Sequence, residues 1–329
     1  MFTRRTLGGL ALLPFLASRT NAGALRTSGP TLRVPEEFAT LGEALAQLPA
    51  GGGVIEIQPG AYREKLIISQ PDVHLRGMGA SPEDVRIVWG DSARTTPGLS
   101  NASTLVASGD GFRASNLTIE NDWSIQNTDP SQAPALFLKA DRAVLRKVRL
   151  LGAQDTLFAG SRNPLAPCRQ YFAECYVEGH VDFIFGNALA FFDRCHLHVL
   201  DHGTGFITAH SRTAEAETSA YVFDHCRITT AGAGRYYFGR AWRPYARVVF
   251  LHTQIDGRID PEGWREWTPG TTRTFETASF VEYASTGPGG DMTHRVAWAK
   301  TLTAPDVANW RLGRVFHDAD WLQERPHGV

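Results

Sequence analysis

The chain has 329 residues, of which 43% are apolar and 20% charged, so it can bury a large core and is neither disordered nor collagen-like. Its 33 basic and 34 acidic side chains leave a net charge of -1 with no basic block, which argues against a protein held on nucleic acid by neutralising phosphates. The 32 Gly and 18 Pro, set between short Val, Ile and Leu runs, exclude a helical bundle and predict a turn-rich, all-β protein.

The N-terminus has the features of an export signal. Thr3-Arg4-Arg5-Thr6-Leu7 carries two adjacent arginines, an apolar run follows to Ala17, and Ala22-Gly23-Ala24 offers small residues for cleavage. We therefore expect residues 1–24 to be a signal peptide, of the bacterial twin-arginine type, that delivers a single domain of residues 25–329 to the periplasm or the medium. A membrane anchor is the alternative, but the apolar run is far short of the ~20 residues that span a bilayer.

A repeat runs through the middle of the chain. Six segments share an apolar start, a polar pair and then alternation, and their equivalent positions lie 31, 27, 20, 31 and 27 residues apart. Strand-like units that recur at such intervals predict a solenoid, here a parallel β-helix, with earlier strands at Val54–Ile57, Val73–Leu75 and Val85–Val88. An antiparallel sandwich would need tight hairpins, yet no Asn-Gly or Asp-Gly pair joins two alternating runs. The equivalent positions are Leu117, Val148, Cys175, Cys195, Cys226 and Thr253.

The four cysteines, Cys168, Cys175, Cys195 and Cys226, form no Cys-x-x-Cys pair, which makes a zinc or redox motif improbable. Cys175 and Cys195 occupy equivalent positions, so they would stack ~4.8 Å apart on adjacent coils. The pair forms either a disulfide or part of a ladder of reduced, buried thiols.

Two aspartates share a second equivalent position. Asp155 lies seven residues after Val148, and Asp182 lies seven residues after Cys175, so the two carboxylates should face each other at roughly the 5 Å separation of adjacent coils. Carboxylates this close share a proton, and a protonated acid beside an ionised carboxylate suits acid–base and nucleophilic catalysis. Capping of turns and a calcium site are the alternatives.

Further motifs give the chain a resemblance to the pectin methylesterases, from about Leu32 to Trp267. That resemblance implies a right-handed parallel β-helix with an external cleft, acting on methyl-esterified homogalacturonan without a metal or cofactor. Tyr62 and Glu64 are expected to be structural. The matching motifs, in order, are Gly60-Ala-Tyr-Arg-Glu64, Gln132-Ala-Pro-Ala-Leu136, Gln154-Asp155-Thr156-Leu157, Asp182-Phe-Ile-Phe-Gly186, Gly239-Arg240-Ala241-Trp242 and Gly263-Trp264.

The resemblance also implies a role for each catalytic residue. Asp182 would be the nucleophile and Asp155 the general acid and base. Gln132 and Gln154 would stabilise the oxyanion, and Arg240 would hold the nucleophile ionised and aimed.

Substrate binding is assigned to aromatic faces and one histidine. His210 stands in Thr208-Ala-His210-Ser-Arg-Thr213, where the family usually has glutamine, and Ala241 replaces a usual proline. Both departures concern substrate preference more than reaction type. A monomer is expected, because the cleft is open and the charge near neutral. The aromatic residues are Trp242, Trp264, Phe158 and Phe185.

Several other functions compete with this assignment. A polygalacturonase could use Asn127-Thr128-Asp129 but also needs an adjacent Asp-Asp pair, which the chain lacks. A pectate lyase would need a richer carboxylate cluster for calcium. A non-catalytic glycan-binding solenoid gives no reason for the two aspartate motifs to share an offset. A related esterase acting on another ester or thioester is the hardest to separate by sequence.

Overall fold

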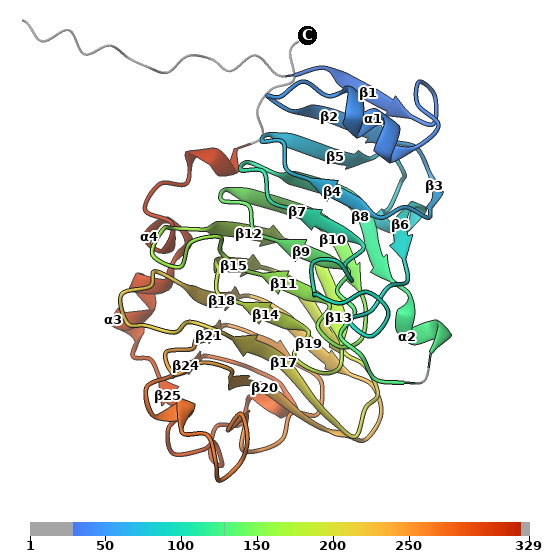
Figure 1. Ribbon diagram of the computed structural model, residues 1–329. Helices are drawn as coiled ribbons and strands as arrows, with labels where there is room; N and C mark the ends of the chain where they lie inside the picture. The colour runs from blue at the N-terminus through green and yellow to red at the C-terminus, as the bar shows by residue number, and fades with distance from the viewer. Residues whose placement is uncertain (1–28, 128, 324–329) are drawn as a thin grey trace, which may run out of the picture.

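The computed structural model describes residues 29–127 and 129–323, and the export signal expected at residues 1–24 lies outside them. The chain winds into a right-handed parallel β-helix whose coils stack from the N-terminal to the C-terminal end (Figure 1), which confirms the predicted fold. All strand pairs among the described residues are parallel, so the antiparallel sandwich is excluded.

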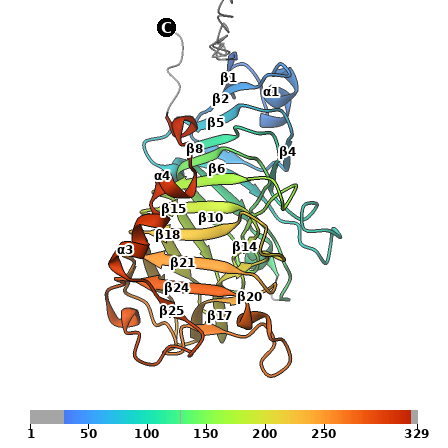
Figure 2. The ribbon, with the colours of Figure 1, turned by 90° about the vertical axis from the view of Figure 1, so that its left-hand side faces the viewer.

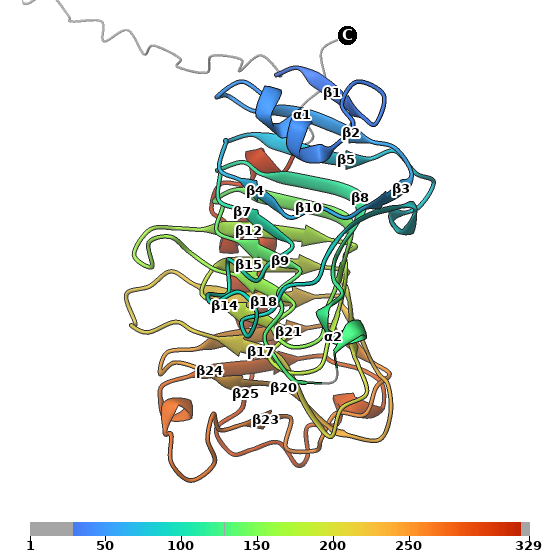
Figure 3. The ribbon, with the colours of Figure 1, turned by 45° about the vertical axis from the view of Figure 1, so that its right-hand side comes forward.

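The strands form three stacks along the molecule. The third stack carries the candidate active site. The first stack contains β1 (Thr31–Val34), β2 (Gly53–Ile57), β5 (Val73–Gly77), β8 (Arg113–Asn121), β10 (Ala143–Leu151), β12 (Arg169–Ala173), β15 (Leu189–Asp193), β18 (Ala220–Asp224), β21 (Arg247–Leu251), β24 (Ser279–Tyr283) and β25 (Lys300–Thr301). The second contains β3 (Gly60–Tyr62), β6 (Val85–Trp89), the far halves of β8 and β10, β13 (Tyr176–Gly179), β16 (His196–Val199), β19 (Arg227–Thr230) and β22 (Gln254–Ile255). The third contains β4 (Leu66–Ile68), β7 (Leu105–Ala107), β9 (Leu136–Leu138), β11 (Leu157–Ala159), β14 (Ile184–Gly186), β17 (Thr204–His210), β20 (Arg235–Ala241) and β23 (Trp264–Arg265). The strands of the third stack can be followed down the molecule by the labels β4, β7, β9, β14, β17, β20 and β23 in Figure 3.

Helices are few and short. They are α1 (Leu41–Gln47), α2 (Trp123–Gln126), α3 (Ala304–Val307) and α4 (Leu312–Val315), with 3-10 turns η1 (Pro82–Asp84), η2 (Thr274–Glu276), η3 (Pro288–Gly290), η4 (Ala308–Trp310) and η5 (Asp320–Leu322). Within the described residues, no helix combines the length and apolar character needed to cross a membrane.

The equivalent positions of the sequence repeat are paired with one another between adjacent coils of the structure. Val148 pairs with Leu117, and the pairs Tyr176–His196 and His196–Arg227 place Cys175, Cys195 and Cys226 in one row. The residue before each repeat position has a left-handed backbone, with φ between 46° and 53°, and this conformation turns the chain from the first stack into the second. These corner residues are Asn116, Lys147, Glu174, Arg194, His225 and His252.

The interior is filled by ladders of like side chains. Phe172, Phe192, Phe223 and Phe250 stack from coil to coil with ring centroids 4.5 Å apart at each step. All four cysteines are buried and free, so Cys175 and Cys195 belong to a ladder of reduced thiols. Burial raises the pKa of Cys175 well above its usual range, which keeps the thiol protonated and unreactive.

Helical segments cover the N-terminal end and one side of the fold. Helix α1 closes the N-terminal end, and the Glu64 carboxylate accepts hydrogen bonds of 2.9 Å from the backbone N–H groups of Leu41 and Gly42 at its first turn. The Tyr62 hydroxyl donates to the Gln58 carbonyl oxygen. Glu64 and Tyr62 are therefore structural, as expected. The C-terminal segment with α3 and α4 runs back along the outside of the first stack (Figure 2).

Candidate active site

The two aspartates lie at the same corner of adjacent coils, as the offsets predicted. Asp155 precedes β11 and Asp182 precedes β14, and the following residues Leu157 and Ile184 are partners in the register. Both aspartates have left-handed backbones, with φ of 64° and 51°, and only 7% and 6% of their surfaces are exposed. The Asp155 N–H donates to the Val181 carbonyl oxygen at 3.1 Å, and this hydrogen bond joins the corner of Asp155 to that of Asp182.

Arg240 holds Asp182 from β20, two coils beyond β14 in the third stack. Its Nε donates to Oδ1 of Asp182 at 3.0 Å and its Nη2 to Oδ2 at 2.7 Å, a two-bond contact that fixes the orientation of the carboxylate. The guanidinium carbon lies 4.2 Å from the ring centroid of Phe206 and 4.1 Å from that of Trp267, so the cation is sandwiched between two aromatic faces.

The surroundings of the two carboxyl groups determine which of them holds the proton. Burial raises the pKa of Asp155 well above its usual range, the Asp182 charge adds to that rise, and Arg240 opposes it. Burial also raises the pKa of Asp182, but two hydrogen bonds and the positive charge from Arg240 oppose the rise. Because only Asp182 contacts the guanidinium, the pair keeps its proton on Asp155 and its charge on Asp182.

Gln132 and Gln154 lie side by side next to this pair. Isolated parallel bridges join Gln132 to Gln154 and Gln154 to Val181, so three adjacent coils contribute to one row. Neither side-chain amide hydrogen-bonds to another described residue, which leaves both as donors for a ligand. A cavity of about 430 Å³ is lined by Ser131 and Ala153, the residues that precede the two glutamines, and by His180, but neither glutamine lines it.

An aromatic row covers the outer face of the third stack beside the aspartates. Phe158 stacks on Phe137 at 4.1 Å between ring centroids and meets Phe185 at 5.1 Å, and Trp242 lies 6.2 Å from Phe185. Phe158 and Trp242 are half-buried, with faces open to solvent. Phe185 is only 2% exposed, so the prediction that it offers a free face to sugar is wrong, because its neighbours cover it. Phe137, whose register with Phe158 the repeat could have indicated, is 8% exposed and supports the Phe158 ring from behind rather than offering a face of its own.

The predicted substrate contact of Trp264 is wrong, because its side chain lies in the interior with no exposed surface. Trp264 pairs with Gly239, next to the outward-facing Arg240, and alternation along a strand turns this position inward. There its indole stacks on Phe280 at 4.4 Å and its Nε1 donates to Glu282 at 3.0 Å.

The same correction applies to His210, which was expected to line a subsite. It is fully buried, and its Nδ1 accepts the Arg247 backbone N–H at 3.0 Å. Burial lowers the pKa of His210 to about 3, so the ring is neutral and cannot bind the carboxylates of a substrate as a cation. The position next to it in the register, Ala241, is buried as well.

Trp267 takes the place that sequence reasoning gave to Trp264. Its ring stacks against Trp242 with centroids 6.1 Å apart and covers Arg240, and its carbonyl oxygen accepts a hydrogen bond from the Arg240 Nη1 at 3.3 Å. The motif Gly263-Trp264 led the sequence prediction to a tryptophan three residues before the one that lies at the site. Only the burial of Trp264 distinguishes the two tryptophans.

The geometry suits covalent acyl transfer on an ester. An oriented carboxylate, a neighbouring protonated acid and two free amide donors supply a nucleophile, a proton donor and an oxyanion site. The calcium alternative fits less well, because Arg240 already engages both oxygens of Asp182.

Comparisons with known proteins point to a family of ester hydrolases. The model of the Pectinesterase family matches residues 34–314. The chain is 34% identical over 305 residues to Pectinesterase 31 of Arabidopsis thaliana, covering 88% of this chain and 91% of the relative. The solved pectin methylesterase from carrot matches with a TM-score of 0.80 at 26% identity, over 89% of this chain and 94% of that one. A pectin methylesterase in complex with a hexasaccharide matches with a TM-score of 0.72 at 27% identity, over 89% and 98%.

Proposed function

The chain belongs to the pectinesterase family and is an enzyme that removes methyl esters from pectin, and from this premise we propose that it works with Asp182 as nucleophile and Asp155 as general acid and base. The observation that carries the proposal is the two-bond contact of Arg240 with Asp182, beside a buried second carboxyl group on the adjacent coil. Only Asp182 is both oriented and paired with a cation, as a carboxylate nucleophile must be.

In the first half of the reaction, a carboxylate oxygen of Asp182 attacks the carbonyl carbon of the C6 methyl ester. The amide groups of Gln132 and Gln154 donate to the carbonyl oxygen as it becomes negative, an effect worth ~3–4 kcal/mol per donor. Asp155 then gives its proton to the departing methoxide oxygen, so that methanol leaves and an acyl anhydride with Asp182 remains.

In the second half, Asp155 is ionised and takes a proton from a water molecule. The resulting hydroxide attacks the acyl carbon, the bond to Asp182 breaks, and the carboxylic acid left on the polymer releases its proton to solvent and becomes a free carboxylate. Both aspartates return to their starting protonation states, so the cycle balances without a metal or a redox cofactor among its reactants.

The substrate we propose is methyl-esterified homogalacturonan, bound along the outer face of the third stack. A related pectin methylesterase has been solved in complex with a hexasaccharide, which supports an oligosaccharide as the ligand. Trp242 and Phe158 have flat, partly open rings that suit the apolar edges of sugars. We also propose that residues 1–24 direct export by the twin-arginine route, as expected from their adjacent arginines and apolar run.

Methanol release from highly methylated pectin tests the role of Asp182. We expect Asp182→Asn to lose at least about 1000-fold in kcat, because the amide cannot form the acyl intermediate. The matched control is Asp256→Asn, which removes an exposed aspartate paired with Arg227 and should leave the rate unchanged.

Two results would count against the mechanism. Methanol release by a folded Asp182→Asn protein at the wild-type rate would remove the nucleophile from the scheme. Formation of an unsaturated, ultraviolet-absorbing product from pectin would instead support a lyase.

A further inference from the structure

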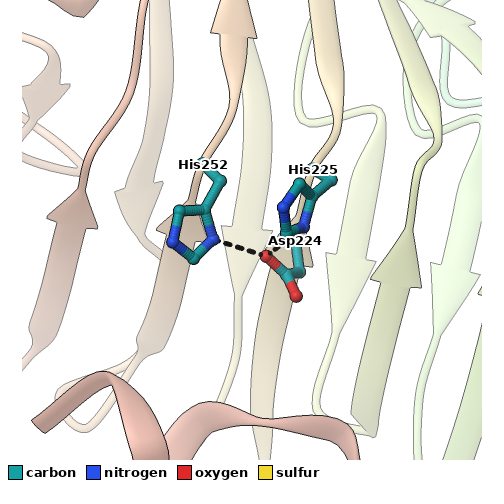
Figure 4. A group of neighbouring side chains, drawn as sticks. All are labelled: Asp224, His225 and His252. Atoms are coloured by element: carbon teal, nitrogen blue, oxygen red, sulfur yellow. Dashed lines mark hydrogen bonds and ion pairs between the residues drawn. The ribbon is translucent and has the colours of Figure 1, made fainter.

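A cluster of metal-ligating side chains lies at a different corner of the β-helix from the aspartate pair. Asp224 ends β18, His225 follows it, and His252 occupies the equivalent corner of the next coil. The Nδ1 atoms of His225 and His252 lie 2.9 Å and 3.0 Å from the same Asp224 oxygen, Oδ1. Figure 4 shows the two rings on adjacent coils with the carboxylate between them.

The backbone holds these three residues in fixed relative positions. The His225 N–H donates to the Leu251 carbonyl oxygen at 3.1 Å, and the His252 N–H donates to that of Tyr283 at 2.9 Å. Both histidines have left-handed backbones, with φ of 52° and 46°, and their rings stack with centroids 4.7 Å apart. Donor atoms are thus aligned by the ladder of the coils rather than by flexible loops.

We propose that Asp224, His225 and His252 form a binding site for one divalent transition-metal ion, with Zn²⁺ as the best fit. Three ligand atoms, one from each residue, lie within 4.8 Å of one another. Ligands ~2.0–2.1 Å from a tetrahedral zinc ion are separated by about 3.3 Å, so the present 2.9–3.0 Å contacts need to open by a few tenths of an ångström. The two imidazole planes, now 25° apart, also need to rotate so that both Nδ1 atoms point at one ion.

The donor set selects the class of metal. Two imidazoles and one carboxylate suit zinc and its neighbours in the first transition row, whereas calcium and magnesium require oxygen ligands. The His225 side chain is 61% exposed, so a water molecule can complete the fourth position. A metal here would join the coil of Asp224 and His225 to that of His252, and would therefore stabilise the stack without entering the ester chemistry.

The test is a zinc titration by isothermal calorimetry, on protein made without a histidine tag and stripped with a chelator. We expect one saturable site per chain in the wild type. His225→Gln combined with His252→Gln should weaken zinc binding ~10-fold or more, and Asp224→Asn should weaken it less. The matched control is His196→Gln combined with His198→Gln, which removes two histidines of the second stack that both bond to Thr229 and should keep full affinity.

Thermal unfolding gives an independent reading on the same proteins. Zinc at hundredfold excess over its Kd should raise the Tm of the wild type by about 5 °C and leave that of the double histidine variant unchanged. Wild-type Co²⁺ spectra need no variant and should show the visible absorption of a four-coordinate ion with nitrogen ligands. The proposal is overturned if the wild type binds no zinc saturably, or if the Asp224, His225 and His252 variants bind it as tightly as the wild type.

Discussion

Asp155 and Asp182 occupy equivalent backbone positions, yet their chemistry differs because of a single neighbour. Both are buried at left-handed corners, and only Asp182 receives the guanidinium of Arg240. Burial without a partner favours the neutral form of a carboxyl group, whereas a cation that donates two hydrogen bonds to it favours the charged form. The division of labour in the proposed mechanism therefore depends on which coil carries the arginine.

Because its pKa is raised, Asp155 lowers the stability of the folded protein at neutral pH. The folded state holds the Asp155 proton more tightly than the unfolded state, so stability falls as pH rises from about 4, the unfolded value, through the folded pKa. Asp155→Asn removes this cost, and we expect its Tm to exceed that of the wild type at pH 8 by about 2 °C or more, and the gap to close near pH 4. Thermal melts across pH measure this, and a lower Tm than wild type at pH 8 would contradict the assignment.

Arg240→Lys tests whether geometry or charge holds the nucleophile. Lysine keeps the charge but cannot make two parallel bonds to Asp182 or lie flat between Phe206 and Trp267. We expect kcat on methylated pectin to fall at least ~10-fold with a smaller change in KM. Arg265→Lys, at the adjacent register position over Tyr237, is the control and should stay within about twofold of wild type. Equal losses in both variants would argue against a specific role of the Arg240 geometry, and a wild-type kcat for Arg240→Lys would show that charge alone is enough.

At the scale of the element, each coil is defined by a left-handed corner and an inward aromatic or thiol ladder. The corner residues are not glycine, although a left-handed backbone costs an L-residue ~1–2 kcal/mol. Parallel pairing on both sides offsets that cost, since neighbouring coils supply hydrogen bonds to the corner N–H groups, as at His225 and His252. The interior ladders provide the apolar burial that holds the coils together.

Phe223→Ala tests the contribution of the phenylalanine ladder. Phe223 is fully buried between Phe192 and Phe250, so its removal leaves a cavity that the flanking coils cannot close, and we expect the free energy of unfolding to fall by about 3–5 kcal/mol. Leu165→Ala, at a residue 69% exposed, should change it by less than ~0.5 kcal/mol. Chemical denaturation measures both, and a loss below 1 kcal/mol for Phe223→Ala would show that the ladder relaxes.

At the scale of the whole molecule, the C-terminal segment acts as an outer strap on the first stack. Phe316, Trp321 and Leu322 form a second apolar cluster with outward residues of the sheet. The Arg113 and Arg146 side chains donate to the carbonyl oxygens of Trp321 and Leu322 at 2.5 Å and 2.9 Å. This strap crosses a different stack from the one that carries the aspartates.

Trp321→Ala should loosen the strap without affecting the chemistry. The indole is 8% exposed and packs on Phe316 at 5.1 Å, so its loss should lower the free energy of unfolding by about 2–3 kcal/mol. We expect limited proteolysis to cleave the segment after α3 faster than in the wild type, while kcat on methylated pectin is unchanged. A fall in kcat at a temperature where the variant is fully folded would mean that the strap supports the active site.

The sequence alone determined the β-helix, its register and the meeting of the two aspartates. These follow from repeat offsets, since stacked coils bring equivalent positions ~4.8 Å apart whatever the loops do. Only the tertiary structure decided which side chains face solvent. Whether Trp264 or Trp267 lies outside depends on the residue at which the strand begins after its corner. Side chains alternate along a strand, so a shift of one residue exchanges the inward and outward positions. The same dependence buried His210, because a corner's direction is set by backbone geometry that no local residue pattern specifies.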